Sequence, residues 1–65
     1  MTIKEKLLEL LNDWDQEKIN VSSWEQDFLE TFEPHINTAP DELPNLSDKQ
    51  EEAIEKMYRK YVEGE

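Results

Sequence analysis

The sequence predicts an all-α fold, a small domain of three helices over about residues 3–17, 23–33 and 48–62. A proline-rich connection over 34–46 joins the last two helices. Each predicted helix follows a Ser or Thr that can cap its first turn, and apolar residues then recur at helical spacing. No alternating apolar and polar run and no two-residue hairpin turn indicates a strand. At 65 residues the chain is one domain, 1–65.

The first helix begins after Thr2. Thr2 and Glu5 have the spacing of a capping box, in which the hydroxyl accepts from the Glu5 amide and the carboxylate accepts from the Thr2 amide. The apolar stripe that follows ends before the polar residues 15–18, and its members are Ile3, Leu7, Leu10, Leu11 and Trp14. We expect Ile19 and Val21 to pack against the core and so hold the short connection between the first two helices in place.

The second helix begins after Ser22 or Ser23, since Glu25 or Gln26 stands three residues further on and either choice makes a capping box. Acids in the first turn also favour the positive end of the helix dipole. Pro34 disfavours helical geometry at the preceding residue, so the helix is predicted to end at 33. Its apolar positions are Trp24, Phe28, Leu29 and Phe32.

The connection over 34–46 contains all 3 prolines of the chain. Pro40 suits the first position of a short helical turn over 40–43. We expect the connection to be held to the core by its apolar residues, Ile36, Leu43 and Leu46.

The third helix begins after Ser47, which forms a capping box with Gln50. Gly64 is a plausible stop signal. The apolar stripe of this third helix is Ala53, Ile54, Met57, Tyr58, Tyr61 and Val62. Together the three helices predict a core of Leu7, Leu11, Trp14, Trp24, Phe28, Phe32, Ile54, Met57 and Tyr61. As the alternative, one indole is half exposed and anchors a partner, because aromatic residues are enriched at interfaces.

The formal net charge of −10 is concentrated in the middle of the chain, where residues 19–48 carry seven acids and no Lys or Arg. Such a region repels nucleic acid and anionic lipid and attracts basic protein surfaces. In the simpler interpretation it is a solvated, solubilising coat. The candidate partner-binding residues are Trp24, Glu25, Asp27, Glu30, Glu33, Asp41 and Glu42.

The residue types that catalysis and cofactor binding require are scarce, so we expect a protein that is not an enzyme and holds no cofactor or metal. His35 is the single histidine, there is no cysteine, and Gly64 is the single glycine, which leaves no phosphate-cradling loop. Charges interrupt the N-terminal segment, which therefore resembles neither a signal peptide nor a membrane span. A cytoplasmic location is the expectation.

A weaker candidate is a site for single-stranded nucleic acid on the third helix, where basic residues stand beside Tyr58 and Tyr61. Its residues are Lys49, Lys56, Arg59 and Lys60. The same bases also neutralise nearby acids, and phosphate binding would oppose the charge of the whole molecule.

Two strings, SSWEQDFLE (22–30) and LSDKQEEAIEKMY (46–58), resemble a bipartite pattern of small bacteriophage proteins and of C-terminal segments of phage helicase- and primase-like proteins. The small protein encoded beside the UvsW-type recombination helicase of T-even phages is one candidate relative. The resemblance makes Trp24, Phe28, Lys49 and Gln50 the family-typical positions. It implies an accessory to nucleic-acid transactions in a phage-infected host that acts through a protein partner. The acidic, proline-rich insert departs from the pattern.

Three functions follow as hypotheses. The first is a helical adaptor that binds a basic surface of a protein engaged in replication, recombination or repair. In the second, the central carboxylates mimic nucleic acid and inhibit a host DNA- or RNA-binding protein or a defence nuclease. The third is weak single-strand binding through the third helix.

Overall fold

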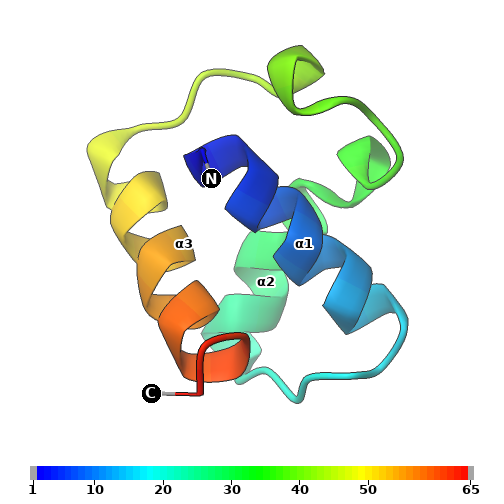
Figure 1. Cartoon of the computed structure of the whole chain (residues 1–65), viewed down its shortest axis with the longest axis vertical. Helices are drawn as coiled ribbons and strands as arrows, with labels where there is room; N and C mark the ends of the chain where they lie inside the picture. The colour runs from blue at the N-terminus through cyan, green and yellow to red at the C-terminus, as the bar shows by residue number, and fades with distance from the viewer. Residues whose placement is uncertain (1, 65) are drawn as a thin grey trace.

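Three α-helices form the body of the protein in a computed structural model that describes residues 2–64: α1 (Ile3–Asp15), α2 (Ser23–Thr31) and α3 (Asp48–Tyr61) (Figure 1). Two short 3-10 helices, η1 (Glu33–His35) and η2 (Pro40–Glu42), interrupt the connection between α2 and α3. No strand occurs within residues 2–64, so the predicted all-α class is confirmed. The first and last positions of the domain predicted over 1–65 lie outside the described residues.

Helices α1 and α3 lie side by side and run in the same direction. Lys6 pairs with Glu55, and one turn later Glu9 accepts a hydrogen bond from Tyr58. Helix α2 runs back behind them, and the connection then crosses the end of the molecule where α1 and α3 begin (Figure 1). The start of α2 therefore lies near the ends of α1 and α3.

The connection is fixed at one point to α1, because the Lys4 ammonium donates a hydrogen bond to the Leu43 carbonyl oxygen at 3.3 Å. Leu43 is buried, and Ile36 and Leu46 pack partly buried against the core, as the sequence predicted. The short turn expected at Pro40 is present as η2. The acidic insert thus covers the end of the core next to the start of α1.

All three helices begin at the predicted caps. Thr2 and Ser47 form reciprocal capping boxes with Glu5 and Gln50, which satisfy amides that the first turn leaves unpaired. Of the two serines offered for the second helix, Ser22 is the N-cap.

The ends of the helices were predicted too late. α1 stops at Asp15 instead of 17 because the chain turns in a Schellman motif: the Glu17 amide bonds the Trp14 carbonyl at 3.0 Å, and the Lys18 amide bonds the Asp13 carbonyl at 2.8 Å. The motif needs a left-handed residue, and Glu17 supplies it with a φ of 59°.

The other two helices also end early. α2 stops at Thr31 instead of 33, and the chain continues through Pro34 in the tighter η1 turn. α3 stops at Tyr61, one residue before the predicted end at 62. Gly64 lies beyond it in the left-handed region with a φ of 77°.

The core is more aliphatic than the sequence predicted. Its buried apolar residues are Leu7, Leu10, Leu11, Leu29, Phe32, Leu43, Ile54 and Met57. Trp14, Phe28 and Tyr61 are only partly buried around this cluster, and the Phe28 and Phe32 rings meet with centroids 5.3 Å apart.

The placement of Trp24 in the core was wrong, since 55% of this residue is exposed. Glu25, Leu29 and Phe32 face the interior at a spacing of four and three residues, and each is at most 3% exposed. Trp24 precedes Glu25, so it lies about 100° around the helix from that face. In the first turn of α2, the side chain that faces the interior is therefore the acid Glu25 and not Trp24.

This placement predicts a large difference between two substitutions. Leu10→Ala removes a fully buried side chain and should lower the free energy of unfolding by about 2–5 kcal/mol. Trp24→Ala leaves no cavity and should cost less than about 1 kcal/mol. Urea unfolding followed by circular dichroism measures both values, and equal losses would show that the indole belongs to the core.

Candidate protein-binding surface

The structure withdraws Glu25 from the acids expected to face a partner, because the residue is 2% exposed. Its Oε1 accepts three hydrogen bonds, from the Ser22 amide at 2.8 Å, the Ser22 hydroxyl at 3.0 Å and the Tyr61 hydroxyl at 2.5 Å. The Lys60 ammonium lies 3.9 Å from its Oε2. Glu25 therefore joins the start of α2 to the last turn of α3. We call Glu25 and its partners Ser22, Lys60 and Tyr61 the Glu25 junction.

The carboxyl stays charged in this position. Burial alone favours the neutral acid, but the hydrogen bonds from Ser22 and Tyr61 and the charge of Lys60 outweigh it and hold the pKa of Glu25 below its usual value. Burial and the bond to Glu25 raise the pKa of the Tyr61 hydroxyl. The hydrogen bond with Tyr61 and the nearby charge of Glu25 raise the pKa of the Lys60 ammonium.

The sequence identified half of this arrangement. The serine three residues before Glu25 indicated a capping box, but nothing in the local pattern indicated Tyr61 and Lys60, which lie more than thirty positions away. Helical spacing alone placed Tyr61 on the apolar stripe, without showing that its hydroxyl would meet an acid.

Trp24 is directed outward by this junction. Because Glu25 is held in the interior, the neighbouring indole must project from the first turn of α2. Asp27 and Glu30 are exposed further along the same helix, and the Gln26 amide donates a hydrogen bond to Glu30 at 3.1 Å. We call Trp24, Asp27 and Glu30 the outer face of α2.

The remaining candidate acids lie elsewhere. Glu33 is exposed in η1, whereas Asp41 and Glu42 are exposed in η2, which packs against α1. Within residues 2–64, none of these three acids forms an ion pair, and neither do Asp27 and Glu30. The charge is therefore free to act on molecules outside the protein.

The four bases proposed for nucleic acid are all exposed on α3. Lys49, Lys56 and Lys60 share one side of the helix by register. Lys60 is engaged in the junction with Glu25, and its ammonium lies 4.9 Å from the centroid of the Tyr61 ring. This set is therefore weakened as a nucleic-acid site by the internal role of one member.

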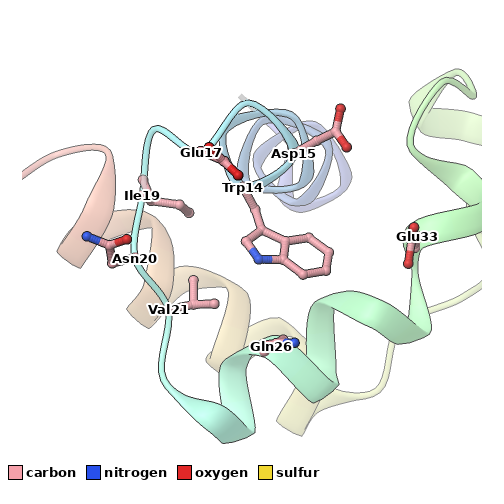
Figure 2. Close-up of a pocket in the computed structure, with 8 residues that line it drawn as sticks. All are labelled: Trp14, Asp15, Glu17, Ile19, Asn20, Val21, Gln26 and Glu33. Atoms are coloured by element: carbon pink, nitrogen blue, oxygen red, sulfur yellow. The ribbon is translucent and has the colours of Figure 1, made fainter.

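An open groove of about 600 Å³ lies between the end of α1 and α2 (Figure 2). The Trp14 indole projects into it from α1, with Ile19 and Val21 along one side. Its full lining is Trp14, Asp15, Glu17, Ile19, Asn20, Val21, Gln26 and Glu33. Through Gln26, which bonds Glu30, the groove adjoins the Glu30 end of the outer face of α2. Trp24 lies about 160° around the helix from Gln26.

Two features are absent from the described part of the chain, a cluster of metal ligands and a membrane-spanning helix. Among residues 2–64 no three His, Cys, Asp or Glu side chains gather closely enough to hold a metal ion. No helix in that part of the chain is long and apolar enough to cross a bilayer.

The chain matches no protein-family model, no curated protein and no solved structure. The resemblance to phage proteins therefore stays a prediction. The exposed indole and acids of α2 remain the candidate surface on structural grounds alone.

The Glu25 junction predicts a pH-dependent contribution to stability. An unfolded glutamate has a pKa near 4.5 and the folded group a lower one, so the stabilisation is complete above the unfolded value and disappears as the pH falls through the folded value. Glu25→Gln should cost about 1–3 kcal/mol at neutral pH. The difference in the free energy of unfolding between this variant and the wild type should shrink as the pH falls from about 6 to about 3.

Urea unfolding at a series of pH values provides this measurement. Glu30→Gln is the matched control, because it removes an exposed carboxylate from the same helix and should show little difference at any pH. A difference for Glu25→Gln that grows on acidification would contradict the assigned direction.

Proposed function

We propose that the protein is a non-enzymatic acidic adaptor that binds a basic surface of another protein through the outer face of α2. The observation that carries this proposal is Trp24, a large aromatic residue 55% exposed on a helix whose other outward residues include acids that form no ion pair within residues 2–64. Burial of such a ring contributes strongly to association, and Trp is enriched among the residues that dominate binding energy.

Charge supports a basic partner. The net charge is −10, and the residues from 19 to 48 contain no Lys or Arg. Charges of this kind raise the rate of association with a basic surface and discriminate against acidic ones. The indole would then supply affinity, while Asp27 and Glu30 supply orientation.

The partner class follows from the resemblance stated above. A protein that handles nucleic acid carries the basic surface that this charge selects. We therefore propose a partner engaged in replication, recombination or repair, with a helicase as one candidate. The phage origin and the cytoplasm of an infected host are part of the same proposal.

A capture experiment tests the adaptor role. Immobilised wild-type protein should retain a basic protein from lysate of the source cells. Trp24→Ala should reduce that retention at least tenfold while its circular dichroism and unfolding remain close to wild type, because the ring packs outside the core. Quantitative mass spectrometry of the bound fraction gives the ratio.

Two controls separate the alternatives. The double variant Asp27→Asn with Glu30→Gln should weaken capture less than Trp24→Ala and flatten its salt dependence; the reverse order of effects would favour nucleic-acid mimicry. Nuclease treatment of the lysate should leave capture unchanged. Loss of capture after nuclease, restored by added oligonucleotide and abolished by Lys49→Ala with Lys56→Ala, would favour direct nucleic-acid binding.

A further inference from the structure

The groove between α1 and α2 is open to solvent and has the volume of a binding cleft. Its volume of about 600 Å³ falls within the range of roughly 300–1,000 Å³ that is usual for clefts that hold small groups. One wall is the Trp14 indole, and Ile19 and Val21 provide apolar surface beside it (Figure 2). These residues could accommodate the methylene stem of a long side chain.

Carboxylates stand on both sides of that indole. In Figure 2, Glu17 lies near the base of the ring and Glu33 lies at the opposite side of the groove. Neither forms an ion pair within residues 2–64. Among the described residues, no three His, Cys, Asp or Glu side chains gather closely enough to hold a metal ion. An extended organic cation is the better complement.

A guanidinium meets these requirements better than an ammonium. It is planar and stacks on an aromatic face, and its five N–H groups can bond acceptors on different sides at once. An ammonium is a compact, strongly hydrated charge that would leave one side of the groove unused.

We propose that this groove binds an arginine side chain of the protein partner, with the guanidinium stacked on Trp14 and bonded to Glu17 and Glu33. The inference rests on the proposed function, because it supplies the chemistry of the basic surface that the adaptor recognises. The groove adjoins the outer face of α2 only at Glu30, which Gln26 bonds. Trp24 lies about 160° around α2 from Gln26, so the groove and Trp24 would contact different parts of the partner.

A second hollow provides an internal comparison. It is lined by Ile3, Asp48, Glu51, Glu52 and Glu55, and thus has acids but no aromatic wall. Binding governed only by charge would affect both hollows, whereas the proposed site requires the indole.

A blocked Gly-Arg-Gly tripeptide, titrated into ¹⁵N-labelled protein and followed by NMR, tests the site directly. The Trp14 indole N–H and the Glu17 and Asn20 amides should shift and saturate, with an affinity on the order of millimolar. The Glu51 and Glu52 amides should not. The same tripeptide with citrulline in place of arginine keeps the shape without the charge and should give no saturating shift.

Variants test the assigned partners. Glu33→Gln should weaken tripeptide binding about fivefold. Glu17→Gly should do the same while leaving the melting temperature equal or higher, since glycine adopts the φ of 59° at this position without strain. Asp41→Asn with Glu42→Gln removes charge from η2 and should leave binding within about twofold.

Absence of a saturating shift at Trp14, or equal weakening by the η2 variant, overturns the arginine site. The capture experiment distinguishes failure of the arginine site from failure of the adaptor role. If Trp24→Ala abolishes capture and Glu17→Gly with Glu33→Gln does not, the adaptor role stands and the groove has no part in it. If neither variant affects capture, the adaptor role itself fails.

Discussion

The buried carboxylate of Glu25 is the constraint on which the rest of the structure depends. It accepts hydrogen bonds from Ser22 in its own helix and from Tyr61 in α3, so one group caps α2 and fastens it to the helix that follows. A charge is tolerated in the interior because donors and the Lys60 ammonium compensate for lost hydration. The same junction leaves Trp24 outside, and the proposed function begins there.

Much of the architecture could be predicted from local pattern. The caps at Thr2 and Ser47, the stripe of Leu7, Leu10 and Leu11, and the anchoring by Leu43 all follow from short-range spacing, and the structure contains them. The end of α1 was missed because a left-handed glutamate stands where a glycine is the usual signal.

The errors at the candidate site have a different origin. Hydrophobicity ranks an indole above a carboxylate for the interior, and that ranking placed Trp24 inside and Glu25 outside. The order is reversed because Glu25 finds three hydrogen bonds there, and two of its partners lie far along the chain. The groove was missed for a similar reason, since Trp14, Val21 and Glu33 come together only when α2 folds back.

Two kinds of recognition are proposed on either side of α2, an aromatic anchor at Trp24 and an acidic, aromatic groove next to Gln26. Both are positioned by the way the start of α2 is held. An NMR titration of the Glu25 side-chain carboxyl tests that claim most directly. We expect its midpoint to lie below 4.5, which is the value of an ordinary glutamate. A midpoint above that value would mean that burial outweighs the hydrogen bonds and the Lys60 charge, and the junction described here would be wrong.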